Sequence, residues 1–294
     1  MTPDITVIIV SWNTCDYLRR CLASLPRAVA APERLCVHVV DNGSTDGTLE
    51  MVRSEFPWVR LDAAGENLGF ARANNRALKA CCTEYALLLN PDTEVRPGAL
   101  DRLVAFMERE PRAGAAGPTL LNTDGSLQKA GDAFPTLIRE VLCAPGLRSL
   151  RWLDGWRHRL TFQRRSFDHV VEVDGVLGAC VLVRRAVWEQ VGLLDERFFM
   201  YYEEIDWYRR MRAAGWQVFY VPEVVVVHHG GKSSGQRGLE NSRIYFRSRY
   251  LYFRKHHGLL QAGLIALLNA MLLWGAEWKS RARRSPQPPA HPSP

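Results

Sequence analysis

The sequence lacks the paired cysteines and the leader segment that mark secreted or disulfide-rich proteins. It has seven cysteines, an odd number, and no CxxC motif. Most of them lie among apolar residues, which favours buried free thiols in a reducing cytosol. Residues 1–4 run straight into a strand-like stretch, so we expect no signal peptide. No internal repeat is visible.

The C-terminal part of the chain has almost no acidic residues. Residues 241–294 contain nine Lys or Arg and one acid, Glu277, which gives about +8. The formal net charge is +7, so the remainder of the chain is close to neutral. A basic tail beside a neutral body favours an anionic surface as partner rather than a nucleic-acid groove.

The sequence also lacks an apolar run of the length that a bilayer span requires. The longest candidate, residues 259–274, has 16 residues, whereas a span needs about 20. Basic residues flank it on both sides, which favours a helix lying at a membrane interface. Packing of this helix on the domain or on a second subunit is the alternative, and the sequence leaves both open. Residues 285–294 are rich in proline and are expected to be disordered.

The first hundred residues alternate between strand-like and helix-like patterns. Continuous apolar runs at residues 5–10, 35–40 and 85–89 are typical of strands buried on both faces, and residues 59–62 form a shorter candidate strand. Helical spacing occupies residues 17–25 and 67–80. This order predicts a mostly parallel sheet with helices on both faces. Further along, Pro222 lies within the apolar stretch 218–227, which therefore predicts two short strands or an edge strand.

Three polar side chains stand where two of the buried strands are predicted to end. Asp41 closes the second strand, and Asn90 and Asp92 follow residues 85–89. In open parallel sheets ligands bind at the carboxyl ends of the strands. Asp92 with Asn90 suits a hard cation such as Mg²⁺ or Mn²⁺, which completes its shell with phosphate and water. Capping of the Asn-Pro-Asp turn explains the tripeptide equally well.

Two further residues near these strand ends suit a nucleotide. A buried carboxylate at Asp41 accepts hydrogen bonds from a base or ribose, although it also suits a cap of the turn at Ser44 and Thr45. Trp12 follows the first strand, where it is placed to stack on a base. A tryptophan in that position is more often part of the core.

A second acidic cluster begins a predicted helix about 110 residues after Asp92. Glu203, Glu204 and Asp206 lie there. A carboxylate that takes the proton of an acceptor hydroxyl makes it a better nucleophile, and shielding by Tyr201 and Tyr202 raises its pKa. The alternative is that acids at a helix start only interact with the helix dipole.

The stretch from His228 to Ser234 follows an apolar strand. A neutral imidazole of His228 or His229 suits a metal shell, and the glycine-rich backbone with Lys232 suits a diphosphate. A solvated loop is the alternative.

Taken in order, these motifs resemble those of family 2 glycosyltransferases, and most closely the rhamnosyltransferase-like branch. The resemblance covers residues 4–235. The motifs that carry it are Val7-Ile8-Ile9-Val10-Ser11-Trp12-Asn13, Val40-Asp41-Asn42-Gly43-Ser44, Asn67-Leu68-Gly69-Phe70-Ala71-Arg72-Ala73-Asn74-Asn75, Leu88-Leu89-Asn90-Pro91-Asp92, Gly178-Ala179-Cys180, Glu203-Glu204-Ile205-Asp206-Trp207 and His228-His229-Gly230-Gly231.

The resemblance implies an α/β GT-A fold with a mixed, mostly parallel sheet, a nucleotide-diphosphate sugar donor, a divalent metal (Mg²⁺ or Mn²⁺) and inversion at the anomeric carbon. It assigns catalysis to Glu204 and Glu203, and the metal to Asp92, His228 and His229. Nucleotide-sugar binding is assigned to Ser11, Trp12, Asp41, Asn67, Arg72, Asn75, Asn90 and Lys232. The acceptor side is assigned to Asp206, Trp207 and Gly178. Many members have Glu-Asp where this chain has Glu203-Glu204; we favour Glu204, in the usual Asp position, as the base.

This interpretation predicts a GT-A domain over residues 1–240, a helical extension over 241–284 and the tail over 285–294. Expected partners are a sugar nucleotide, with dTDP-rhamnose favoured over other UDP, dTDP or GDP sugars, and a glycan or lipid-linked acceptor in cell-surface polysaccharide synthesis. A membrane surface or a second subunit would meet the extension, and no nucleic acid is expected. The expected location is the cytoplasm, at the inner face of the membrane.

Two other classes of protein compete with the glycosyltransferase interpretation. A nucleotide-binding oxidoreductase needs a glycine-rich loop after the first strand, and the residues there, Ser11-Trp12-Asn13-Thr14, include no glycine. A non-catalytic relative that binds sugar nucleotides, or that scaffolds a membrane assembly, is disfavoured by the intact Asp92, Glu203 and Glu204. Release of nucleotide diphosphate distinguishes an enzyme from such a binding module.

Overall fold

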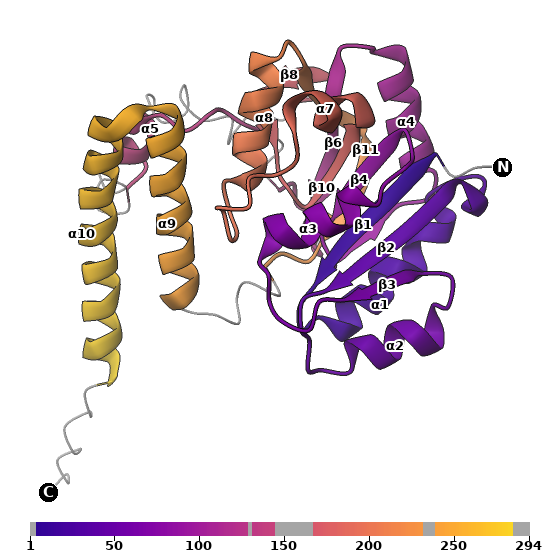
Figure 1. The fold of residues 1–294 in the computed structure, drawn as a ribbon, viewed down its shortest axis with the longest axis horizontal. Coiled ribbons are helices and arrows are strands. Elements are labelled where there is room, and N and C mark those ends of the chain that lie inside the picture. Colours follow the sequence, from indigo (N-terminus) through magenta and orange to yellow (C-terminus); the bar gives the residue numbers. More distant parts are fainter. Residues whose placement is uncertain (1–3, 129–130, 145–166, 232–238, 285–294) are drawn as a thin grey trace, which may run out of the picture.

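The computed structural model describes residues 4–128, 131–144, 167–231 and 239–284. Within these residues a nine-stranded sheet has helices on both faces, and two long C-terminal helices stand beside it (Figure 1). The mixed α/β architecture and the C-terminal helical region agree with the prediction.

The N-terminal half is a parallel sheet in the strand order β3-β2-β1-β4. β1 is buried along its whole length because both its faces are covered. The four strands of this parallel half are β1 (Ile5–Ser11), β2 (Leu35–Asp41), β3 (Arg60–Ala63) and β4 (Tyr85–Leu89). The helices between them are α1 (Cys15–Ser24), α2 (Thr48–Glu55) and α3 (Phe70–Lys79).

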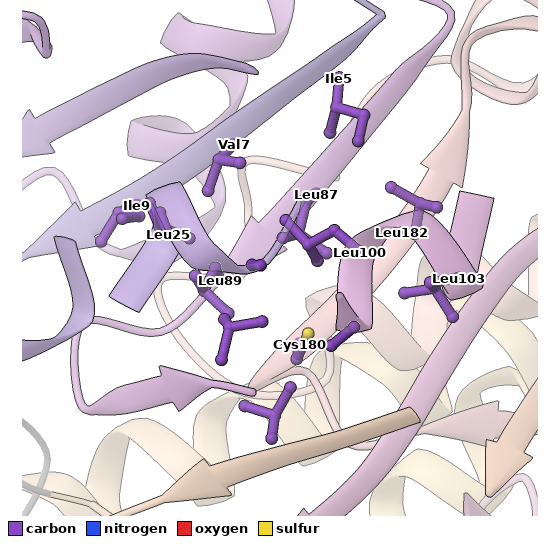
Figure 2. Close-up of a cluster of buried hydrophobic side chains, with 14 of the residues drawn as sticks. Ile5, Val7, Ile9, Leu25, Leu87, Leu89, Leu100, Leu103, Cys180 and Leu182 are labelled. Atoms are coloured by element: carbon purple, nitrogen blue, oxygen red, sulfur yellow. The ribbon is translucent and has the colours of Figure 1, made fainter. Parts of the chain in front are cut away.

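The two faces of this sheet belong to two separate cores, because successive residues of a strand point to opposite sides. Ile5, Val7 and Ile9 of β1 pack with residues of α1 and α4 (Ala99–Arg109), the cluster shown in Figure 2. Ile8 and Val10 pack with α3, α7 (Arg185–Val191) and α8 (Glu203–Ala213) on the other face.

The second half of the sheet makes it mixed. β10 (Cys180–Arg184) runs antiparallel to β4 and to β6 (Ala113–Leu121). β11 (Gln217–His228) is parallel to β6, and β5 (Thr93–Val95) and β8 (Val171–Val173) pair antiparallel with β11. A small separate sheet joins β7 (Gly131–Asp132) to β9 (Gly175–Val176), and a short helix, α5 (Leu137–Leu142), follows β7.

The prediction of two short strands or an edge strand around Pro222 was wrong. β11 is one strand of 12 residues with partners on both sides. Proline is tolerated because its ladder with β6 shifts register between Val221 and Val225, so the missing N–H breaks no ladder bond there. The carbonyl of Pro222 accepts a hydrogen bond from Thr119 Oγ1 (3.0 Å).

The C-terminal extension is a hairpin of α9 (Leu239–His256) and α10 (Gly258–Arg284), which lie side by side in Figure 1. Its inner face has a core of its own, in which Tyr252 and Ile265 pack with Phe198 and Tyr202 from the loop before α8. α10 has 27 residues, more than the 16-residue apolar run predicted, because the helix continues through polar residues. By length and composition, residues Gly258–Gly275 suffice to cross a membrane, and 17% of that window is buried.

Candidate active site

A cavity of about 290 Å³ opens where the carboxyl ends of the strands meet. Its lining comes from loops that follow β1, β2, β3, β4, β9 and β11, from the segment that precedes α8 and from the first turn of α8. Of the residues singled out in the sequence, it contains Trp12, Asn67, Asn90, Asp92, Gly178, Glu203, Glu204 and His228. The fold therefore brings together the two acidic stretches that are 110 residues apart in the sequence.

Asp41 both caps a turn and keeps one oxygen unpaired. Its Oδ2 accepts hydrogen bonds from the backbone N–H groups of Gly43 (3.1 Å) and Ser44 (2.9 Å). Its Oδ1 is buried and has no hydrogen-bond partner in the described part of the chain. Asp41 itself does not line the cavity, whereas the next residue, Asn42, does. Ser11, its register partner on β1, is buried and bonds Thr14 Oγ1 (3.0 Å) rather than facing the cavity.

Asp92 and His228 form a buried pair at the floor of the cavity. Asp92 Oδ1 lies 3.3 Å from His228 Nε2, which makes no hydrogen bond. The other ring nitrogen, Nδ1, lies 2.8 Å from Gln128 Oε1. Gln128 Nε2 donates to His228 O (2.7 Å) and Asn122 Oδ1 (2.8 Å), so Gln128 Oε1 must be the acceptor. His228 Nδ1 therefore carries a proton, and Nε2 is the ring nitrogen that faces Asp92.

This pair fits a divalent cation. A carboxylate oxygen and an imidazole lone pair repel each other unless a cation or proton lies between them. Two protein ligands are enough for Mg²⁺ or Mn²⁺ when a diphosphate and water supply the rest of the shell. The described residues include no group of three His, Cys, Asp or Glu placed to hold a metal.

His229 does not reach the cavity. Its Nε2 lies 2.8 Å from Glu94 Oε1, and its ring packs near Tyr17. Its backbone N–H donates to Asp92 O (2.8 Å), so it fixes the Asp92 backbone rather than adding a metal ligand. Lys232 lies outside the described residues.

Glu203 and Glu204 occupy the first turn of α8 and both line the cavity. Burial raises the pKa of Glu203 well above its ordinary value, and the charge of Glu204 and a hydrogen bond between the two carboxyls raise it further. The pair therefore holds a proton that a separate, solvated glutamate would lose. Gly178 makes room for this arrangement, since a Cβ at that position would lie 3.2 Å from Glu204 Oε1.

The turn that leads into α8 is strained. Tyr201 and Tyr202 have φ of 70° and 68°, a left-handed conformation that bulky residues rarely adopt. Side chains of α9 hold both tyrosines. Tyr201 Oη donates to Asn241 Oδ1 (2.9 Å), and Tyr202 Oη lies 3.3 Å from Tyr245 Oη. Strained backbone at a cavity that holds paired carboxylates is typical of functional sites.

The structure does not bring Asp206 or Trp207 to the cavity, although both were assigned to the acceptor side. Asp206 is a fully buried residue of α8, and its carboxylate contacts side chains of α9. Its carboxylate binds Arg210 Nε (2.9 Å), Lys255 Nζ (2.6 Å) and His256 Nε2 (2.7 Å). Burial opposes ionisation, but the hydrogen bonds from His256 and Lys255 outweigh it and lower the pKa of Asp206. The indole N–H of Trp207 donates to Gly192 O (2.9 Å) in the core.

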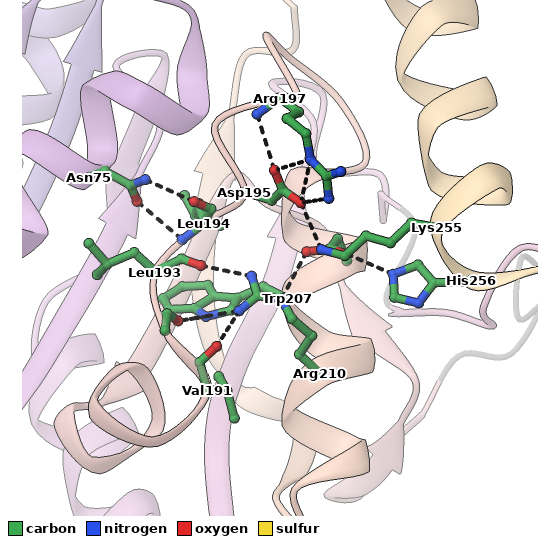
Figure 3. Close-up of polar contacts among 12 residues, drawn as sticks. Asn75, Val191, Leu193, Leu194, Asp195, Arg197, Trp207, Arg210, Lys255 and His256 are labelled. Atoms are coloured by element: carbon green, nitrogen blue, oxygen red, sulfur yellow. Dashed lines mark hydrogen bonds and ion pairs between the residues drawn. The ribbon is translucent and has the colours of Figure 1, made fainter.

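Arg72 and Asn75 of α3 also face away from the cavity. Asn75 forms two hydrogen bonds with the backbone of Leu194, through its Nδ2 (2.8 Å) and its Oδ1 (3.1 Å), as Figure 3 shows. Arg72 lies on the surface, 3.8 Å from Glu196. The face of α3 that carries Arg72 and Asn75 therefore packs against the loop before α8 and does not line the cavity.

Comparison with known proteins identifies the family. A family model described as glycosyl transferase family 2 matches residues 6–192, more than half of the chain. The chain belongs to this family. It is 33% identical to N-acetylglucosaminyl-diphospho-decaprenol L-rhamnosyltransferase of Mycobacterium tuberculosis, over 97% of both chains. It is 26% identical to the dTDP-rhamnosyl transferase RfbF of Shigella flexneri, over 87% of this chain and 82% of the relative.

A solved structure supports the fold of this glycosyltransferase. The mannosyltransferase PcManGT from Pyrobaculum calidifontis, in complex with GDP-Man and Mn²⁺, aligns with a TM-score of 0.56 and 18% identity. The match covers 99% of this chain and 78% of that chain. The GT-A fold, the family and the rhamnosyltransferase-like resemblance predicted from the sequence are thereby confirmed.

Proposed function

We propose that this glycosyltransferase moves a sugar, with inversion, from a nucleotide-diphosphate sugar to a hydroxyl of a lipid-linked glycan in cell-surface polysaccharide synthesis. The observation that carries the proposal is one cavity lined by Asp92 with His228 and by Glu203 with Glu204. dTDP-rhamnose is the favoured donor because the Shigella flexneri relative is named for it. An N-acetylglucosaminyl diphospho-lipid is the favoured acceptor, from the name of the Mycobacterium tuberculosis relative.

The donor side would consist of Trp12, Asn67 and the Asp92–His228 pair, together with Asp41, which precedes the lining residue Asn42. The unpaired Oδ1 of Asp41 suits a donor group of the base or ribose, and Trp12 offers a ring face to the base. Asp92 and His228 would hold Mg²⁺ or Mn²⁺ through a carboxylate oxygen and a neutral imidazole. When bound, this ion would offset the charge that develops on the leaving diphosphate.

Glu204 would be the base. As the acceptor oxygen bonds to the anomeric carbon, its proton passes to Glu204. The bond from that carbon to the diphosphate oxygen breaks, and the electron pair leaves with the diphosphate. Glu204 is more exposed than Glu203, which is 4% exposed, and it stands against the open side of Gly178. Burial and the charge of Glu204 raise the pKa of Glu203, so Glu203 would hold the proton of the pair and Glu204 would be the carboxylate left ionised to accept the proton of the acceptor.

The outer face of α10 would lie on the cytoplasmic side of a membrane, close to a lipid-linked acceptor. Leu260, Leu267, Met271 and Trp274 are 64% to 81% exposed and recur at helical spacing. The charge of about +8 over residues 241–294 favours anionic lipid over a second copy of the chain. The double substitution Leu260→Gln and Leu267→Gln is expected to reduce co-sedimentation of the protein with anionic phospholipid vesicles. Unchanged sedimentation together with a loss of dimer would identify a second subunit as the partner instead.

A screen of nucleotide sugars tests the donor side without an acceptor. Each candidate donor is added with and without Mn²⁺, and the melting temperature Tm is recorded. A donor at 100 times its Kd adds about 2.7 kcal/mol to the free energy of unfolding. Stabilisation by a dTDP sugar that requires Mn²⁺ is the expected result. Absence of stabilisation by every donor would contradict the proposal, and release of nucleotide diphosphate would exclude a non-catalytic binding protein.

A further inference from the structure

A second cavity of about 190 Å³ adjoins the first. The two share three lining residues, Leu177, Tyr201 and Glu204. Glu203 lines only the first cavity, so Glu204 is the carboxylate that faces both. If the first cavity holds the donor, the second lies on the other side of the proposed base. That is where an acceptor hydroxyl must stand.

Five of the residues that line the second cavity are aromatic. Phe134, Tyr202, Tyr208 and Tyr245 contribute to its lining from the segments around β7, α8 and α9. Aromatic walls with a few polar groups are typical of sites for small organic ligands, and tyrosines combine an apolar ring with a hydroxyl. Tyr245 comes from the C-terminal hairpin, so the helical extension completes this cavity.

The charged side chains of the second cavity are already paired within the protein. Arg139 donates to Ala133 O, and Glu140 Oε2 binds Arg249 Nη1 (2.9 Å). Asp174 pairs with Arg212 and also accepts a hydrogen bond from the backbone N–H of Phe134 (3.0 Å). A phosphate group would therefore meet the carboxylates of Glu140 and Asp174 and would have to displace the hydrogen bond of Arg139. A neutral ligand with hydroxyl groups meets neither obstacle.

The hydroxyl of Tyr208, a residue that lines this cavity, is buried. Tyr208 is 1% exposed, and its hydroxyl makes no hydrogen bond within the described residues. Its ring packs on Gly175, where a Cβ would lie 2.6 Å from Tyr208 Cδ2, so the backbone is shaped to hold the ring in this position. A buried hydroxyl left without a partner is costly, and a native site that keeps one usually supplies the partner as ligand or water.

We propose that the second cavity is the subsite for the acceptor sugar. The ring of the sugar packs on the tyrosines, one of its hydroxyls bonds Tyr208 Oη, and the attacking hydroxyl lies at Glu204. The inference rests on the proposed function for the position of the donor. The diphosphate and lipid of the acceptor would remain outside this cavity.

The test compares Tyr208→Phe with the matched control Tyr220→Phe. Tyr220 is also 1% exposed, but its hydroxyl bonds Thr119 Oγ1 (2.6 Å) within the sheet. With an N-acetylglucosaminyl diphospho-lipid as acceptor, Tyr208→Phe is expected to raise the acceptor KM about three- to tenfold, the effect of one neutral hydrogen bond. Donor affinity should not change. Tyr220→Phe should lower Tm and leave the acceptor KM as it was.

Binding of methyl N-acetylglucosaminide, measured by saturation-transfer NMR, separates this inference from the proposed function. Binding by the wild type that Tyr208→Phe weakens and Tyr220→Phe does not would support the subsite even if no transfer is detected. An acceptor KM and a saccharide affinity that are both unchanged in Tyr208→Phe would overturn it. The Tyr208 hydroxyl would then have no ligand, and Tyr208→Phe should have the same Tm as the wild type or a higher one.

Discussion

The two sides of the active cavity are held in place by different parts of the fold. Asp92 follows a buried strand of the sheet, and the β1–β4 ladder fixes its position. Glu203 and Glu204 follow a strained turn, whose tyrosines are held by Asn241 and Tyr245 from 40 and 43 residues further along. The proposed donor side therefore depends mainly on the sheet, whereas the proposed base also depends on the C-terminal hairpin. Each experiment below acts on one side and asks whether the other responds.

The largest effect is expected at Asp92. Asp92→Ala removes the carboxylate that faces His228, and transfer should fall by at least about 10³-fold because charge on the leaving group is no longer offset. The part of donor stabilisation that requires Mn²⁺ should disappear, while the protein stays folded. Glu94→Gln is the control, since Glu94 bonds His229 outside the cavity. Undiminished turnover of Asp92→Ala with donor and Mn²⁺ would contradict the metal assignment.

Glu204→Gln should act on the other side alone. Loss of a general base costs about 10²- to 10⁴-fold in kcat. Donor binding, followed by Tm, should be the same as in the wild type because the donor side is intact. If Glu203→Gln abolishes transfer and Glu204→Gln does not, the base is Glu203.

Asp206→Asn is expected to loosen the hairpin. The change leaves Lys255 and Arg210 without their shared carboxylate, and breaking a buried pair costs about 3–5 kcal/mol of unfolding free energy. The pKa of Asp206 is lowered by folding, so its stabilisation is present above the ordinary pKa of aspartate and is lost as pH falls through the folded-state value. The deficit of the variant should therefore shrink in acid.

Asp62→Asn is the control for that measurement, because the Asp62–Arg76 pair is near the surface and worth at most about 1 kcal/mol. The sugar-nucleotide donor should still raise the Tm of Asp206→Asn, but the rate of transfer should fall because the hairpin is loosened. An equal loss of donor binding would show that the two sides are not independent.

The smallest effect concerns the pH dependence of stability at Glu203. Folding raises its pKa, so the stability it contributes is present below the ordinary pKa of glutamate and is lost as pH rises through the folded-state value. Glu203→Gln avoids this loss of stability because glutamine does not ionise. The variant should gain Tm relative to the wild type as pH rises, by about 2–4 °C for each kcal/mol of ionisation cost removed. A Tm difference that does not change with pH would show that Glu203 is not buried with its proton.

The donor side could be predicted from the sequence because it depends on short patterns. Apolar, β-branched runs predict buried strands, and the polar residues that follow them, Asp41, Asn90 and Asp92, must lie at one edge of a parallel sheet. The capping alternative for Asp41 was also right, since one oxygen caps the turn. The assignment of Asp41 to the nucleotide stays a prediction, which rests on the other carboxylate oxygen.

The remaining parts could not be predicted, because they depend on contacts between distant segments. Gln128 is 100 residues from His228, and only the β6–β11 pairing brings the two together. Asp206 has the sequence context of a catalytic acid, yet the cations that bury it are on α9. Tyr208 gives no signal in the sequence, since a tyrosine at helical spacing in the core is ordinary. The residue boundaries of the proposed domains stay a prediction.

The left-handed turn at Tyr201 and Tyr202 has a consequence for the order in which the enzyme is completed during translation. The sheet and its strand-end loops are synthesised before α9, whereas the side chains that hold this turn are on α9 itself. A ribosome-bound chain that ends before the hairpin could therefore fold its sheet without fixing the two glutamates. We expect such a nascent chain to bind a sugar nucleotide but not to consume it, so that activity begins only when the last helices are in place.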